Sequence, residues 1–157
     1  MADSKLILAQ QVYGKLISAL TARDWTYARD DDRMRVQFDV HGDDFPMRFV
    51  MIVDADRQQI RLLSRLPFEM SEEKRMEGAV ATCVASFMLP DGSFDYDIST
   101  GEIGFRMTHV FMECDISEEL LQYMISWSCA VVDKYNDKFF AINKGFLSLD
   151  DFIAGDS

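Results

Sequence analysis

Apolar and polar side chains alternate strictly between residues 33 and 66, and this alternation constrains the fold more than any other feature. Three inward-facing sets are predicted from it: Met34, Val36, Phe38 and Val40, then Met47, Phe49, Met51 and Val53, then Ile60, Leu62, Ser64 and Leu66. A period of two is typical of strands that bury one face. Trp25 and Tyr27 begin the same pattern earlier, and the polar turns between runs are too short for a parallel crossover. The segment therefore predicts a four-strand antiparallel meander.

Helical periodicity surrounds this meander. Residues 3–23 place apolar side chains three and four apart, which predicts an amphipathic helix. A second helix is predicted from Ser71, with a buried stripe of Met76, Ala79, Val80, Cys83, Val84, Phe87 and Met88. Strands at 93–99 and 102–112 precede a third helix that Asp115 opens, and Ser148 caps a last short helix. The order α-β-β-β-β-α-β-β-α, in a single domain of residues 1–157, predicts an α+β fold with helices on one face of an antiparallel sheet.

The stretch LPDGSFDYDISTGEIGFRM, residues 89–107, raises the question of a cation site. Asp95, Asp97 and Ser99 alternate as the first ligands of an EF-hand loop do, but that loop needs glycine at its sixth position and glutamate at its twelfth. Those two positions hold Thr100 and Arg106 here. We therefore interpret the stretch as a hairpin that turns at residues 99–102 and binds no metal.

Charge and composition limit the partners. The formal net charge of −11 argues against nucleic acid, because phosphate binding requires a basic surface. No apolar run approaches the roughly eighteen residues of a membrane span, and the N-terminal residues do not resemble a signal peptide. Cys83, Cys114 and Cys129 lack metal-ligand spacing, and two of them fall on predicted apolar helix faces. Buried reduced thiols are predicted, and with them a cytoplasmic location without nucleic-acid or membrane partners.

The sequence offers little for catalysis. His109 lies on the apolar face of its predicted strand, and His41 precedes a polar turn, so neither is placed as a base beside a nucleophile. Phosphate-loop, dinucleotide and serine-hydrolase motifs do not occur in the sequence. Adjacent carboxylates such as Glu72-Glu73 fall at predicted helix starts or turns, where they have structural roles. We therefore predict a non-enzyme without a cofactor or a metal.

Arginines accumulate on the sheet face that the predicted helices leave open. Because side chains alternate along strands, this face carries Arg33, Arg35, Arg48, Arg61, Arg65 and Arg106, interleaved with Val50, Ile52, Leu63 and Val110. Arginine among aliphatic residues is typical of protein interfaces, so the six arginines with Val50, Ile52 and Leu63 form the predicted partner-binding surface. Two alternatives remain open. Asp39, Asp95 and Asp97 can pair with the arginines, or the acidic segment around Asp150 and Asp151 can fold over this face.

A family resemblance covers most of the chain. Leu89, Gly92, Phe94, Asp97, Gly101, Ile103, Phe105 and Arg106 resemble the hairpin segment of the YbjN-like family. The strand with Ile60, Leu62 and Ser64 and the late segment VVDKY…FFAINKG agree with it. That family is similar in fold to the small acidic chaperones of type III secretion, which are typically dimers that hold extended segments of another protein. The resemblance implies a homodimeric, chaperone-like or regulatory protein-binding module with no catalytic residues.

A small-ligand sensor is the rival interpretation. It would hold its ligand in a pocket between the helices and the sheet, near Trp25, Tyr27 and His109. Apolar pockets with a few polar groups are the usual form of such sites.

Overall fold

The computed structural model describes residues 2–155. Its elements are α1 (Ala2–Ala22), β1 (Ala28–Asp30), β2 (Arg35–His41), β3 (Pro46–Asp54), β4 (Gln59–Glu69), α2 (Arg75–Phe87), β5 (Ser93–Asp97), β6 (Glu102–Val110), α3 (Glu118–Lys144) and α4 (Leu149–Gly155). A turn of 3-10 helix, Glu72–Lys74, leads into α2. The predicted α+β class and the predicted order of elements are both confirmed.

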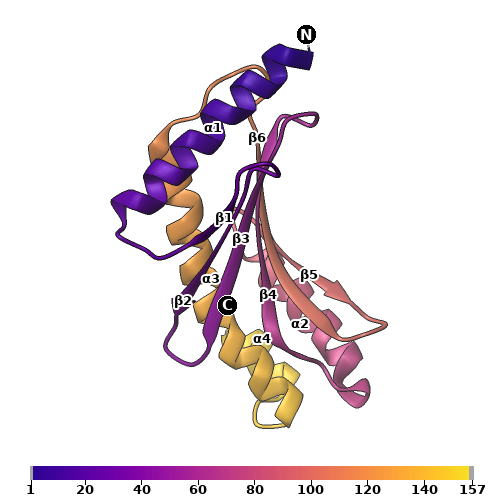
Figure 1. Ribbon diagram of the computed structural model, residues 1–157. Coiled ribbons are helices and arrows are strands. Elements are labelled where there is room, and N and C mark those ends of the chain that lie inside the picture. The colour runs from indigo at the N-terminus through magenta and orange to yellow at the C-terminus, as the bar shows by residue number, and fades with distance from the viewer. Residues whose placement is uncertain (1, 156–157) are drawn as a thin grey trace.

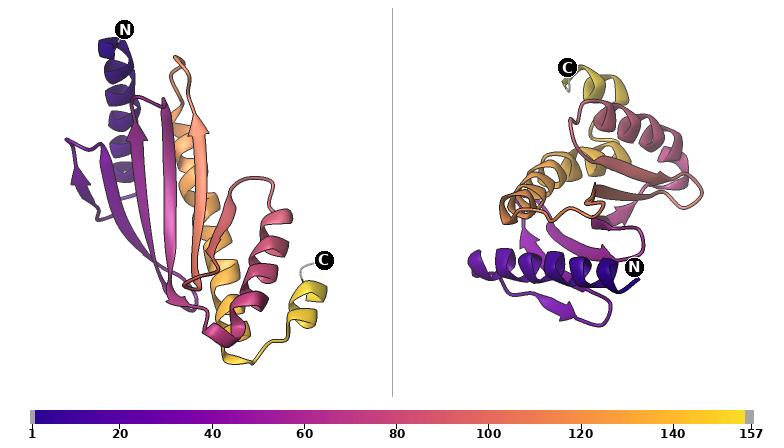
Figure 2. Two further views of the ribbon diagram at one scale, coloured as in Figure 1. Left: turned by 90° about the vertical axis from the view of Figure 1, so that its right-hand side faces the viewer. Right: turned by 90° about the horizontal axis from the view of Figure 1, so that it is seen from above.

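The six strands form one antiparallel sheet in the order β1-β2-β3-β4-β6-β5 (Figure 1). One row of paired residues crosses four strands, from Val36 through Met51 and Leu62 to Met107, and all four side chains are buried. The helices lie on this side of the sheet: α1 and α3 pack behind the central strands, and α2 and α4 continue the layer beside β5 (Figure 2). The strand period therefore places the core between the sheet and the helices.

Helix α1 is joined to α3 and to the segment just before α3 by contacts between residues about a hundred positions apart. The Lys15 ammonium donates to an Asp115 carboxylate oxygen at 2.5 Å and to the Ile116 carbonyl at 2.8 Å. Asp115 was predicted to open the third helix. Instead α3 begins at Glu118, because the Ser117 hydroxyl accepts the Leu120 amide and caps the first turn.

The prediction for the buried face of α2 is wrong. The buried residues are Gly78, Ala81, Thr82 and Ala85. Of the predicted stripe, Ala79 and Val84 are half-buried and the other five residues are exposed. Met76 and Phe87 are 67% and 86% exposed. Small residues let α2 approach β5 closely, since a Cβ added at Gly78 would lie 2.7 Å from the Tyr96 hydroxyl. The same hydroxyl donates to the Arg75 carbonyl at 2.7 Å and fixes the start of the helix.

The predicted hairpin at residues 93–107 is confirmed, because β5 pairs with β6 in antiparallel register. The Asp97 carboxylate stabilises the turn of the hairpin. One of its oxygens accepts a hydrogen bond from the Ser99 hydroxyl at 2.6 Å and another from the Ser99 amide at 2.9 Å. These bonds lower the pKa of Asp97 below its usual value. Gly101 closes the turn at φ +83° and its carbonyl accepts the Met70 amide, which ties the hairpin to the end of β4.

The cysteine prediction is wrong for Cys83, which is exposed, as is Cys114. Cys129 is half-buried, and no cysteine forms a disulfide. Burial raises the pKa of the Cys129 thiol to about 11. Within the part of the chain that the structure describes, no helix is long and apolar enough to cross a membrane.

Cys129 is expected to be the slower of two thiols toward alkylation. A pKa about two units above the usual thiol value leaves roughly a hundredfold less thiolate at pH 8, and the thiolate is the reactive form. Timed labelling with iodoacetamide, read by peptide mass spectrometry, compares Cys129 with the exposed Cys114. Equal rates at the two sites would contradict the burial of Cys129.

Candidate functional site

The candidate site lies on the sheet face that carries no helix, which we call the open face. Its centre is a row in which Arg35 of β2, Ile52 of β3 and Arg61 of β4 stand side by side. The next row holds Gln37, Val50, Leu63 and Arg106. The sheet therefore brings together eight of the nine predicted site residues.

Arg33 is the exception. It lies in the turn before β2, where its guanidinium is 3.8 Å from Asp30. The turn continues through Met34, which has a positive φ of 49°, so the strand begins later than the alternation suggests.

A groove forms on the open face where β3 and β4 separate. Their pairing ends at Val50 and Leu63, although β3 extends back to Pro46 and β4 runs on to Glu69. Just past the last pair, the Ser64 hydroxyl donates to the Arg48 carbonyl at 2.8 Å. The pairing of β4 with β6 also shifts register between Arg65 and Glu69. Both changes open the sheet at this end.

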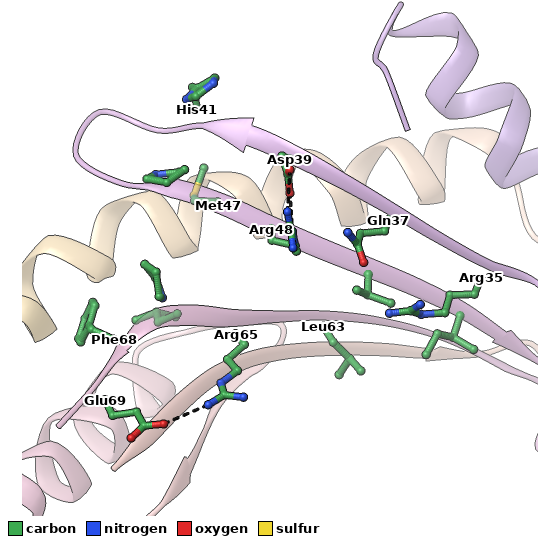
Figure 3. Close-up of a pocket in the computed structure, with 15 residues that line it drawn as sticks. Arg35, Gln37, Asp39, His41, Met47, Arg48, Leu63, Arg65, Phe68 and Glu69 are labelled. Atoms are coloured by element: carbon green, nitrogen blue, oxygen red, sulfur yellow. Dashed lines mark hydrogen bonds and ion pairs between the residues drawn. The ribbon is translucent and has the colours of Figure 1, made fainter. Parts of the chain in front are cut away.

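The groove has a volume of about 1010 Å³ and a mixed lining (Figure 3). Its apolar residues include Met47, Val50, Ile52, Leu63, Leu66 and Phe68, and its charged residues are Arg35, Asp39, Arg48, Arg65 and Glu69. The Phe68 ring packs on Phe45 and Phe140 at centroid distances of 5.8 and 5.4 Å, which joins the β2–β3 turn, β4 and α3. A depression with apolar side chains and a charged rim suits an extended, partly apolar segment of chain.

Sequence reasoning missed the part of the groove formed by Pro46, Met47, Leu66, Pro67 and Phe68. Strand alternation assigns Met47 and Leu66 to the core, and it does so correctly. They also line the groove because the strands separate above them. Pro67 is the available signal, since proline within a strand lacks the amide that a ladder needs.

Three open-face arginines are paired with carboxylates. Arg48 donates to both oxygens of Asp39, at 2.8 and 3.2 Å, and Figure 3 shows the two side chains pointing toward each other across β2 and β3. Arg106 pairs with Asp95 at 3.2 Å. Arg65 forms ion pairs with Glu69 at 3.1 Å and Glu102 at 2.6 Å. Neither glutamate was among the carboxylates predicted to pair with the arginines. The hydrogen bond from Arg48 lowers the pKa of Asp39 below its usual value.

Arg35 and Arg61 differ from these three. Within residues 2–155 neither guanidinium has a hydrogen bond or an ion pair, and the Nε atom of Arg61 is buried without a partner. Ile52 stands between them in the pairing register. Guanidinium groups without a carboxylate partner in the chain can donate to a carboxylate that a ligand brings to this face.

The two alternatives for this face have separate outcomes. Asp39 and Asp95 do pair with arginines, but Asp97 is used in its own turn. The acidic C-terminal segment does not cover the face. Helix α4 lies on the helix side, where the Phe152 ring packs against Phe139 at 5.9 Å. Through residue 155 the open face stays uncovered by the chain's own C-terminal segment.

The aromatic residues expected at a sensor pocket are dispersed. Trp25 packs on Phe38 of β2 with ring centroids 5.6 Å apart, and the Arg23 guanidinium lies over its ring. His109 lies on β6, where it pairs with Ile60 of β4. In the sheet, β3 and β4 separate β6 from β2, the strand that Trp25 contacts. Trp25 and His109 therefore do not meet.

No protein-family model matches this chain, and no curated protein matches it.

Proposed function

We propose that the protein is a non-enzymatic, chaperone-like or regulatory binding module that holds an acidic, partly apolar segment of another protein on its open face. The observation that carries this proposal is the pair of unpartnered guanidinium groups, Arg35 and Arg61, beside an apolar groove. Membership of the YbjN-like family is part of the proposal, and the hairpin around Gly101 that carries the resemblance supports it.

The spacing of the two arginines fits an extended ligand. Two strand intervals of about 4.8 Å separate their backbones, and long side chains can adjust the distance between the charges. Alternate side chains of an extended peptide are about 7 Å apart and point to the same side. Carboxylates at alternate positions can therefore reach Arg35 and Arg61 while the peptide between them passes over Ile52 and its intervening side chain points away from the sheet. Guanidinium binds carboxylate through paired, charge-assisted hydrogen bonds.

A cytoplasmic homodimer completes the proposal. The three cysteines are free, as is usual for proteins of a reducing compartment. Self-association is supported by large apolar side chains that the single chain leaves exposed on α2, among them Met76 and Phe87.

The Arg35→Glu/Arg61→Glu variant is expected to lose binding of an acidic probe. The probe is a fluorescein-labelled peptide that alternates glutamate with valine, and binding is read by fluorescence anisotropy. The variant loses two charge-assisted contacts, each worth about 1.5–3 kcal/mol. Its affinity for the peptide should therefore fall by about 100-fold or more.

The matched control is Arg29→Glu/Arg33→Glu, which makes the same change in net charge away from the open face. Both of these arginines already face carboxylates. This control should change binding less than about threefold. A lysine–valine peptide should not bind the wild-type protein. If the control variant loses as much binding as Arg35→Glu/Arg61→Glu, overall charge and not this pair of arginines determines recognition, and the proposal is wrong.

A further inference from the structure

A second depression lies near the turn that joins β3 to β4, away from the groove of the open face. Figure 1 shows that the first turns of α1 reach the same end of the molecule as this turn. The N-terminal half of α1, the β3–β4 turn and the segment after β6 line the depression, which we call the α1 pocket. Its volume of about 510 Å³ falls within the usual range for small-molecule sites.

Gln58 holds two walls of the α1 pocket together. Its backbone carbonyl accepts the Phe111 amide at 2.9 Å, and its side-chain oxygen Oε1 accepts the Glu113 amide at 2.9 Å. These bonds join the β3–β4 turn to the segment after β6. Gln58, Met112 and Glu113 have positive φ angles of 50°, 36° and 62°. Such backbone conformations cost energy and are concentrated at ligand sites. The two walls are therefore fixed before a ligand arrives, which reduces the cost of binding.

The side-chain nitrogen of Gln58 is available to a ligand. Only 6% of this residue is exposed, yet it lines the α1 pocket. Because the Glu113 amide needs an acceptor, Oε1 faces Glu113 and Nε2 takes the other position. Within residues 2–155, Nε2 donates to no acceptor, and it is not among the atoms that are buried completely. A nearly buried side chain thus presents an N–H group to an oxygen atom placed in the pocket.

Two opposite charges line the α1 pocket without neutralising each other. Lys5 comes from α1 and Glu113 from the segment after β6. In the described part of the chain neither side chain forms an ion pair. Ile7 and Leu8 add apolar surface beside them. A molecule that carries both a negative and a positive charge, together with an apolar group, complements this lining.

From these observations we infer that the α1 pocket binds a free α-amino acid with an aliphatic side chain. The carboxylate of the ligand accepts from the Lys5 ammonium and from Nε2 of Gln58, and the ammonium of the ligand donates to the Glu113 carboxylate. The aliphatic side chain contacts Ile7 and Leu8. This site is separate from the open face and does not depend on the proposed function. Trp25, Tyr27 and His109, predicted for a sensor pocket, do not line it.

The first test is a titration of the ¹⁵N-labelled full chain with L-leucine, followed by NMR. The backbone amide signals of Gln58 and Glu113 and the side-chain amide signal of Gln58 should shift together and give one dissociation constant. N-acetyl-leucine lacks the ammonium group, and leucinamide lacks the carboxylate. Each derivative loses one charge-assisted contact and should bind about tenfold more weakly than leucine.

Charge-removing variants assign the two ends of the ligand. Glu113→Gln should weaken leucine binding about tenfold but leave N-acetyl-leucine unaffected, because that derivative has no ammonium to lose. Lys5→Gln should likewise weaken leucine and leave leucinamide unaffected. Both residues line an open pocket and have no ion pair within residues 2–155, so both variants should keep their circular dichroism spectrum. Glu72→Gln is the matched control, since it removes one carboxylate from the turn before α2, and it should bind leucine as the wild-type protein does.

Three results would each overturn the inference. The first is a wild-type protein whose signals do not respond to leucine. The second is equal binding of leucine and its two derivatives, since the charges would then make no contribution. The third is an equal loss of affinity in Glu72→Gln and Glu113→Gln, which would indicate an effect of overall charge. The Arg35→Glu/Arg61→Glu variant should still bind leucine, so failure of the open-face proposal and failure of this inference can be told apart.

Discussion

The Gly101→Ala variant is expected to lose about 3–4 kcal/mol of unfolding free energy. Gly101 has φ +83°, a conformation that costs energy for any residue with a Cβ. It also lies against the backbone at the end of β4, where an added Cβ would overlap the Met70 carbonyl oxygen and lie 2.9 Å from the Met70 nitrogen. Two backbone segments would have to move, and the hydrogen bond from the Met70 amide to the Gly101 carbonyl would be strained. Urea unfolding at a fixed protein concentration measures the loss.

Gly145→Ala is the control for this prediction. Gly145 ends α3 at φ +76°, but nothing lies within 4 Å of the position that its Cβ would take. This substitution carries only the conformational cost, about 1 kcal/mol. The difference between the two variants isolates the steric clash at Met70. Equal losses of unfolding free energy in the Gly101→Ala and Gly145→Ala variants would contradict this prediction. They would show that the hairpin can move away from Met70 without loss of stability.

The Phe139→Ala variant is expected to lose about 3–5 kcal/mol, and it can fail to fold in cells. The Phe139 ring is fully buried and meets the Phe94 ring edge-on at 5.1 Å and the Phe152 ring at 5.9 Å. It also stacks on Tyr135 at 5.8 Å. One side chain thus joins β5, α3 and α4, and its removal leaves a cavity that these elements cannot close together.

The control here is Phe146→Ala, in which the same number of atoms is removed from an exposed ring. Its unfolding free energy should change by less than about 0.5 kcal/mol. Thermal melts followed by circular dichroism compare the two variants, again at one protein concentration because any self-association makes the melting temperature depend on concentration. A Phe139→Ala protein as stable as Phe146→Ala would mean that α4 does not complete the core.

The strands could be predicted from the sequence because their side chains alternate between only two environments, the core and the open face. Residues such as Phe49 and Met51 face the core and Arg48 faces away, so a period of two locates each strand and its buried side. The start of β2 shows the limit of this reasoning. The alternation continues through Met34, but the backbone turns there with a positive φ, and Arg33 is directed to Asp30 instead of the open face.

The orientation of α2 could not be predicted from periodicity. An apolar stripe indicates that something packs against that face of a helix. It does not indicate whether the packed residues belong to the same chain or to another molecule. Here close packing decided the inner side, because Gly78 and Ala81 approach the sheet where Phe87 would not fit. Small residues carry a weak hydrophobic signal, so the larger outward set dominates any sequence pattern.

The candidate site could be predicted in composition but not in detail. Alternation gathers the arginines on one face, yet it does not distinguish Arg48, which Asp39 binds, from Arg61, which has no partner within residues 2–155. That difference depends on strand register and on where the β3–β4 ladder ends. Neither quantity is visible in a single sequence.

The contacts of α1 with α3 and with the segment just before α3 have a consequence for synthesis. The Lys15 side chain binds Asp115, and Arg23 binds Gln122, so the first helix depends on groups made about a hundred residues later. A chain emerging from the ribosome therefore carries α1 with an incomplete covering until α3, Glu118–Lys144, has been translated. Its apolar side is exposed to other nascent chains throughout that period. Truncation before α3 should leave a product that depends on cellular chaperones, even though the sheet and α2 are already complete.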